Sequence, residues 1–148
     1  MHFFNVRVYG LLIHDGAILT VEEPVHDRII RKFPGGGLEF GEGILDCLKR
    51  EFKEELNCTL TDTRHFYTTD FFVQSFLNPE QQVISVYYLV KARMTQMHYN
   101  LADQLQFKWV LMDELQEDMF PLPIDKVVVS LLHADGAGSV DKYHYFPL

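Results

Sequence analysis

The stretch that decides the fold covers residues 34–58 and reads PGGGLEFGEGILDCLKREFKEELNC. Residues 43–56 carry apolar side chains spaced three, four and four residues apart, which is the period of an α-helix. These apolar residues are Leu45, Leu48, Phe52 and Leu56. Asn57 follows and can adopt the left-handed conformation that ends a helix. We therefore predict an amphipathic helix over residues 43–56.

The glycines at positions 35–37 precede this helix. We predict that they form an irregular loop, because consecutive glycines lose much backbone entropy when they are held in a helix or strand. Gly41 and Gly43 follow in the same segment. Such a run lets the backbone turn tightly and approach a ligand closely.

Three glutamates cluster on one side of the predicted helix. Glu51, Glu54 and Glu55 fall within roughly 100° of arc, beside the apolar stripe. At about 5 Å and an effective dielectric of about 20, one such pair costs about 3 kcal/mol. A hard divalent cation such as Mg²⁺ or Mn²⁺ would neutralise the cluster, because these ions prefer oxygen ligands. The alternative is a solvated charged face, which is the commoner origin of Glu-x-x-Glu-Glu by itself.

The glycines and glutamates together resemble the Nudix box, Gly-x5-Glu-x7-Arg-Glu-U-x-Glu-Glu-x-Gly-U, in which U is bulky and aliphatic. Six fixed positions match, and they are Gly36, Glu42, Arg50, Glu51, Glu54 and Glu55. Asn57 replaces the family glycine, but asparagine tolerates the same left-handed backbone. Phe52 and Cys58 stand at the aliphatic positions and remain apolar. The departures leave the proposed ligand positions intact.

The resemblance implies roles for the box residues. Glu51, Glu54 and Arg50 are implied as catalytic residues. One of Glu51, Glu54 and Glu55 is implied to help deprotonate the attacking water. Arg50 is implied to orient Glu51 through charge-assisted hydrogen bonds. The implied metal ligands within the box are the Gly36 carbonyl, Glu51, Glu54 and Glu55, and Glu42 is a possible further ligand.

Family members often take another carboxylate from outside the box. Asp103, ahead of the predicted strand at 106–111, is the candidate ligand here, and a loop-capping aspartate is the alternative. We predict substrate contacts from Arg28, Arg31, Lys32 and Glu39, although a solvated loop is the commoner origin of such basic residues. The aromatic residues that could stack a base or fill the core are Tyr9, Phe71, Phe72 and Trp109.

The resemblance implies Mg²⁺-dependent cleavage of a diphosphate bond in a nucleoside diphosphate linked to a variable group X. Val73 stands where ADP-ribose-cleaving members tend to have proline. Gln74 and Ser75 stand where dinucleoside polyphosphate members have tyrosine. We therefore favour a nucleoside triphosphate pyrophosphatase over an ADP-ribose or sugar-nucleotide hydrolase. The alternative is a non-catalytic nucleotide-sensing module on the same fold.

The rest of the chain predicts further strands and a second helix. Strands are expected at 5–13, 17–21, 66–76, 82–93 and 106–111, with no element over the polar residues 22–34. A short helical turn is expected at 114–117 and a final helix from about 125 to 133. With the resemblance, this order implies an α/β (α+β) fold, namely a Nudix-like α/β/α sandwich with a central mixed sheet. We expect one domain over residues 1–148.

Composition limits the possible partners and location. The formal net charge of −8 disfavours stable binding to nucleic acid or a membrane surface. The resemblance implies a nucleotide-type small molecule as substrate. The chain has neither a secretory signal nor a run of about 18 apolar residues. Cys47 and Cys58 suit reduced thiols, and we expect a cytoplasmic protein. The resemblance also implies a possible homodimer.

Overall fold

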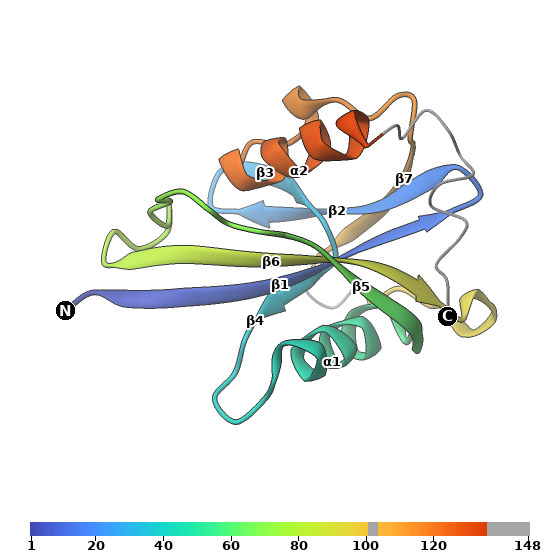
Figure 1. Ribbon diagram of the computed structural model, residues 1–148, viewed down its shortest axis with the longest axis horizontal. Coiled ribbons are helices and arrows are strands. Elements are labelled where there is room, and N and C mark those ends of the chain that lie inside the picture. Colours follow the sequence, from blue (N-terminus) through green and yellow to red (C-terminus); the bar gives the residue numbers. More distant parts are fainter. Residues whose placement is uncertain (101–103, 136–148) are drawn as a thin grey trace.

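The computed structural model describes residues 1–100 and 104–135. A mixed β-sheet lies between two helices, α1 (Ile44–Leu56) on one face and α2 (Pro123–Ala134) on the other (Figure 1). This arrangement confirms the predicted α/β/α sandwich. Within the described part of the chain, neither helix is long and apolar enough to cross a membrane.

The sheet is built around two long central strands that run parallel to each other. The strands are β1 (Phe3–His14), β2 (Ala17–Val25), β3 (Arg28–Lys32), β4 (Gly35–Gly37), β5 (Leu60–Thr68), β6 (Gln81–Ala92) and β7 (Gln106–Leu111). Their order is β3-β2-β1-β6-β5, while β4 also pairs with β1 and β7 with β2. Only the β1–β6 pair is parallel among these described strands. The sheet is therefore mixed, as expected.

The alternation of side chains along β1 creates two separate cores. Val8 and Leu12 face α1 and pack in one buried cluster with Phe52. Tyr9 and Leu11 point to the opposite face and pack in the cluster that contains the α2 residues. Each helix is thus held by apolar burial against its own side of the sheet.

The helix α1 has nearly the predicted bounds, but its apolar stripe differs. Leu45 is 37% exposed and lies outside the core, whereas Cys47 is fully buried. The prediction for Leu45 was wrong because Ile44 and Cys47 are the residues of the first turns that pack in this apolar cluster. Asn57 has φ 47° and ψ 42°, so the predicted left-handed helix end is confirmed.

Two predicted strand assignments were wrong. Residues 22–34, expected to lack an element, form the end of β2, a turn at His26 (φ 54°) and β3. The strand expected at 66–76 is instead β5, at Leu60–Thr68. Polar side chains obscure β3 because it lies at a sheet edge. Two register irregularities in β5 break the alternation that marks a strand.

The C-terminal elements agree better with the sequence. The strand at 106–111 is confirmed by β7, and the final helix begins at Pro123, two residues before the expected start. Proline suits the first turn of a helix, where its missing N–H has no partner to lose. The short helical turn lies at Glu117–Met119 rather than 114–117.

Candidate active site

The glycine run forms strand β4 rather than the irregular loop that we predicted. Gly35 and Gly36 pair with Tyr9 and Val8 of β1, so ladder hydrogen bonds offset the entropy cost of ordering glycine. A Cβ atom on Gly35 would lie 2.1 Å from the Val8 carbonyl oxygen. One on Gly36 would lie 2.4 Å from Oε1 of Glu51. The glycines therefore allow the Glu51 carboxylate to lie directly against the backbone of β4.

Arg50 connects the acidic side chains of α1 to the preceding loop. Its Nη2 and Nε donate to Glu42 at 2.7 and 2.9 Å. Its Nη1 donates to Glu51 at 3.0 Å and to Glu54 at 3.4 Å. Nη2 also donates to the Gly37 carbonyl oxygen at 3.1 Å. One guanidinium thus holds three carboxylates and the end of β4 together.

The carboxyl groups of the site differ in their electrostatic surroundings. Hydrogen bonding by Arg50 lowers the pKa of Glu42 to about 2. Burial raises the pKa of Glu51, and the hydrogen bond from Arg50 opposes this effect. Burial also raises the pKa of Glu55 to about 7, with the charge of Glu51 as the next cause. Glu51 and Glu55 are therefore two partly buried acids that repel each other when both are ionised.

The oxygen donors of this cluster fit a hard divalent cation, which would relieve the repulsion between Glu51 and Glu55. In the described residues, no three acidic, histidine or cysteine side chains already converge as a metal site. The Glu54 side chain is 58% exposed and is held toward Arg50, so it would have to turn to join the other two. Asp103, the predicted outer ligand, lies outside the described residues.

The predicted substrate-binding residues lie in different places. Arg28 is exposed at the start of β3. Arg31 and Lys32 of the same strand each form an ion pair with a glutamate of β2, at 2.6 and 2.5 Å. Glu39 is 70% exposed and lies 3.8 Å from Arg50. Of these four residues, only Lys32 lines the cavity described next.

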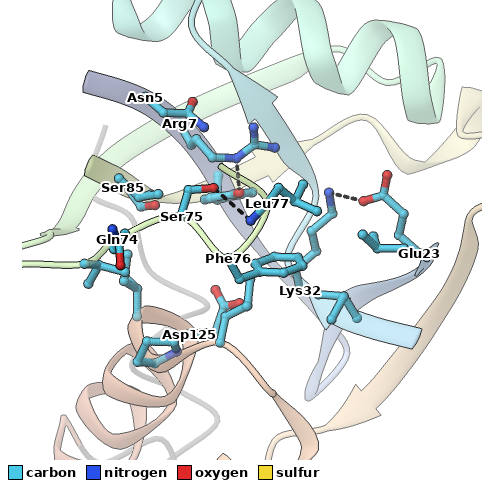
Figure 2. Close-up of a pocket in the computed structure, with 18 of the residues that line it drawn as sticks. Asn5, Arg7, Glu23, Lys32, Gln74, Ser75, Phe76, Leu77, Ser85 and Asp125 are labelled. Carbon is cyan, nitrogen blue, oxygen red and sulfur yellow. Dashed lines mark hydrogen bonds and ion pairs between the residues drawn. The ribbon is translucent and has the colours of Figure 1, made fainter. Parts of the chain in front are cut away.

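A cavity of about 320 Å³ lies on the α2 face of the sheet (Figure 2). Strands β1, β2, β3 and β6, the loop at 73–77 and the start of α2 surround it. Its polar and charged lining residues are Asn5, Arg7, Glu23, Lys32, Gln74, Ser75, Ser85 and Asp125. The sequence analysis found only Lys32 among them. The missed signal is Arg7, a cation between the apolar residues Val6 and Val8 of β1.

A buried carboxyl group forms part of the cavity wall. Asp125 of α2 accepts a 2.7 Å hydrogen bond from the Tyr87 hydroxyl of β6. Burial raises the pKa of Asp125 to about 7, while the bond from Tyr87 and the charge of Lys32 oppose it. Burial also raises the pKa of Tyr87. An aspartate in the otherwise apolar start of a core helix is the signal that sequence reasoning missed.

The four aromatic residues proposed to stack a base or fill the core also lie in different places. Tyr9 is buried and lines the cavity. Trp109 packs on the α1 side of the sheet and donates to the Tyr99 hydroxyl at 3.0 Å. Phe71 and Phe72 are exposed. Only Tyr9 is therefore placed both in the core and beside the cavity.

The fold and the site together indicate the class of protein: an α/β/α sandwich in which the glutamate-rich helix α1 lies against the glycine strand β4. The NUDIX domain family model matches residues 1–131. The chain therefore belongs to the Nudix family.

Solved structures and one curated relative agree with this family. A solved structure of MutT, from work on Aliivibrio salmonicida and Vibrio cholerae, is 25% identical to this chain and has a TM-score of 0.69. The match covers 90% of this chain and 99% of that chain. The MutT NUDIX hydrolase of Burkholderia pseudomallei is 18% identical, with TM-score 0.71 and 88% and 99% covered, which is a likeness of fold.

The curated relative is the mRNA-decapping protein OPG122 of variola virus. It is 37% identical over 65 residues, which are 44% of this chain and 25% of that protein. This chain therefore matches about a quarter of the relative's length. Together, the matches support a Nudix-type pyrophosphohydrolase.

Proposed function

We propose that this chain is a Mg²⁺- or Mn²⁺-dependent hydrolase that cleaves a diphosphate bond in a nucleoside diphosphate linked to a group X. The observation that carries the proposal is the position of Glu51. Its carboxylate lies against the backbone of Gly36, is held by Arg50 at 3.0 Å and is largely buried beside Glu55. A solvated charged face would not hold a carboxylate in this way.

Each residue of the cluster has a proposed role. Glu51, Glu54, Glu55 and the Gly36 carbonyl would hold the metal, with Asp103 as the proposed outer ligand. A bound divalent cation would neutralise diphosphate oxygens and make the attacking water more acidic. Glu51 or Glu54 accepts the proton of this water. Arg50 positions both glutamates through its Nη1.

The proposed order of substrates is the same as the order predicted from the sequence. We favour a nucleoside triphosphate, then ADP-ribose or a sugar nucleotide. Lys32 is the proposed substrate contact at the cavity, with Arg28, Arg31 and Glu39 as outer contacts. An mRNA cap is a second candidate because the likeness to a decapping protein reaches 37% identity. The net charge of −8 argues against strong RNA binding.

The test is a screen with Mg²⁺ and Mn²⁺. The panel contains the common nucleoside triphosphates, ADP-ribose, sugar nucleotides and a capped oligonucleotide, and products are identified by mass. The variant Glu54→Gln should lower turnover by at least about a hundredfold, while Glu114→Gln, a matched exposed glutamate outside the cluster, should not. Undiminished turnover in Glu54→Gln would reject the assignment. Tight nucleotide binding without any product would favour the non-catalytic sensing module.

The remaining expectations concern the whole protein. We propose that it works as a single-domain cytoplasmic enzyme and that it can form a homodimer. Light scattering of the purified chain tests the oligomeric state.

A further inference from the structure

Arg7 is a half-buried cation whose hydrogen-bonding capacity is mostly unused. Its Nε donates to the Tyr9 hydroxyl at 2.6 Å, and its guanidinium lies 5.7 Å from the centre of the Tyr9 ring. Tyr9 thus fixes the direction of the side chain. Among the described residues, the N–H groups on Nη1 and Nη2 have no hydrogen-bond acceptor. These groups form the flat donor fork that binds carboxylates and phosphates.

Lys32 of the cavity and Arg50 of the box each form an ion pair with a glutamate. Lys32 pairs with Glu23 at 2.5 Å, and Arg50 pairs with Glu42 at 2.7 Å. Arg7 has no carboxylate oxygen within 4.0 Å in the part of the chain that the structure describes. The charges of Glu23 and Glu51 act on Arg7 from beyond ion-pair distance. A partly desolvated guanidinium without a direct ion pair is costly. In a protein of net charge −8, this arrangement favours an anion from outside the chain.

Arg7 also lies between the acidic cluster and the cavity. It lines the cavity, as Figure 2 shows, and is paired across the β1–β4 ladder with Gly37. Its Nη1 would lie 3.7 Å from a Cβ atom at Gly37, one residue from the backbone that Glu51 touches. Its charge acts on Glu51 on one side and on Asp125 on the other. Arg7 is therefore placed to contact a ligand that reaches from the cluster into the cavity.

We propose that Arg7 binds the substrate phosphate that lies between the acidic cluster and the cavity, so that the cavity accepts a nucleoside monophosphate moiety in preference to a neutral nucleoside. The inference rests on the proposed function for the class of ligand. The planar guanidinium can donate two parallel hydrogen bonds to phosphate oxygens. The cavity, at about 320 Å³, is within the range of small-ligand sites.

The test measures binding without metal and without turnover. Calorimetry in EDTA compares AMP, GMP, CMP and UMP, each with its own nucleoside. The wild-type protein should bind at least one nucleotide about tenfold or more tightly than its nucleoside. Arg7→Gln should remove this preference and leave nucleoside binding unchanged, whereas Arg7→Lys should keep part of it. The matched control Arg64→Gln removes an exposed arginine from β5 and should behave as wild type.

Two results would overturn the inference. One is an Arg7→Gln variant that retains the full preference for nucleotide over nucleoside. The other is a wild-type protein that binds none of the four nucleotides more tightly than its nucleoside. If Arg7→Gln does not fold, Arg7→Lys decides the matter, because an unchanged preference in that variant also overturns it.

The experiments distinguish a failure of this inference from a failure of the proposed function. Glu54→Gln should abolish turnover but keep the nucleotide preference in EDTA. A preference that depends on Arg7 in a protein without hydrolase activity would reject the proposed function and keep this inference. If the protein hydrolyses a substrate but Arg7→Gln has no effect on nucleotide preference, the proposed function stands and this inference is rejected.

Discussion

Arg50 donates to both carboxylate oxygens of Glu42, from Nη2 to Oε1 at 2.7 Å and from Nε to Oε2 at 2.9 Å. This two-point contact fixes the plane of the guanidinium. Nη1 is then directed at Glu51 and Glu54, which it reaches at 3.0 and 3.4 Å. Glu42 therefore acts on the proposed metal ligands indirectly, through the orientation of Arg50.

Replacement of Arg50 by lysine should separate charge from geometry. Arg50→Lys keeps the positive charge but cannot bind Glu42 and Glu51 at the same time in the same plane. We expect turnover to fall at least about tenfold and the free energy of unfolding to fall by about 1–3 kcal/mol. Steady-state kinetics and urea unfolding measure the two effects. Arg64→Lys is the control, and wild-type turnover in Arg50→Lys would contradict the positioning role.

A methyl group on Gly36 should displace the Glu51 carboxylate. The added Cβ would lie 2.4 Å from Oε1 of Glu51, so this side chain must move away from β4. We expect Gly36→Ala to lower turnover about a hundredfold, because small misplacements of a catalytic group are costly. The control is Gly43→Ala, whose Cβ would meet only the exposed Asp46 carboxylate, at 3.1 Å. Equal activity of the two variants would show that Glu51 need not touch β4.

The local part of the site could be predicted from the sequence. The spacing of Arg50 and the glutamates is a property of one helix, so their common face and the helix end at Asn57 follow from the helical period. Leu45 was misplaced because the period alone does not say which residues of the first turn, here Ile44 and Cys47, pack against the sheet. The position of Glu51 against Gly36 also depends on β1, because this strand aligns β4.

The cavity could not be predicted, because its residues meet only through the sheet register. Arg7 belongs to β1, Lys32 to β3 and Asp125 to α2. The pairing of β3 with β2 and of β2 with β1, and the packing of α2, bring them together, and none of these leaves a repeating pattern in the sequence. The three consecutive glycines were misassigned for a related reason. Their partner strand lies about 28 residues earlier in the chain, where local entropy arguments do not reach.

Gly10 and Phe52 should be coupled in stability. A Cβ atom on Gly10 would lie 2.4 Å from Cζ of the fully buried Phe52 ring. Gly10→Ala should therefore lower the free energy of unfolding by about 1–3 kcal/mol through overpacking. The smaller Phe52→Leu side chain should relieve the clash, so the double variant should be more stable than the sum of the two single changes by at least about 0.5 kcal/mol. Urea unfolding of the four proteins measures this cycle, and simple additivity would contradict the contact.

Asp125 should make the protein less stable as the pH rises from about 4 to about 7. Burial raises the pKa of Asp125 in the folded protein to about 7, whereas the unfolded chain has the ordinary value near 4. Between these values the folded state keeps a proton that the unfolded state releases, so the contribution of Asp125 to stability falls with rising pH. A pKa difference of about three corresponds to about 4 kcal/mol.

Asp125→Asn removes this ionisation and can keep a hydrogen bond to the Tyr87 hydroxyl. The variant should therefore gain stability relative to wild type between pH 5 and pH 8, by up to about 4 kcal/mol. Urea unfolding at several pH values measures the difference. Asp118→Asn, which changes an exposed aspartate near the same helix, is the matched control. A stability difference between Asp125→Asn and wild type that does not change with pH would mean that Asp125 is ionised in the folded protein, with Lys32 and Arg7 supplying the compensating charge.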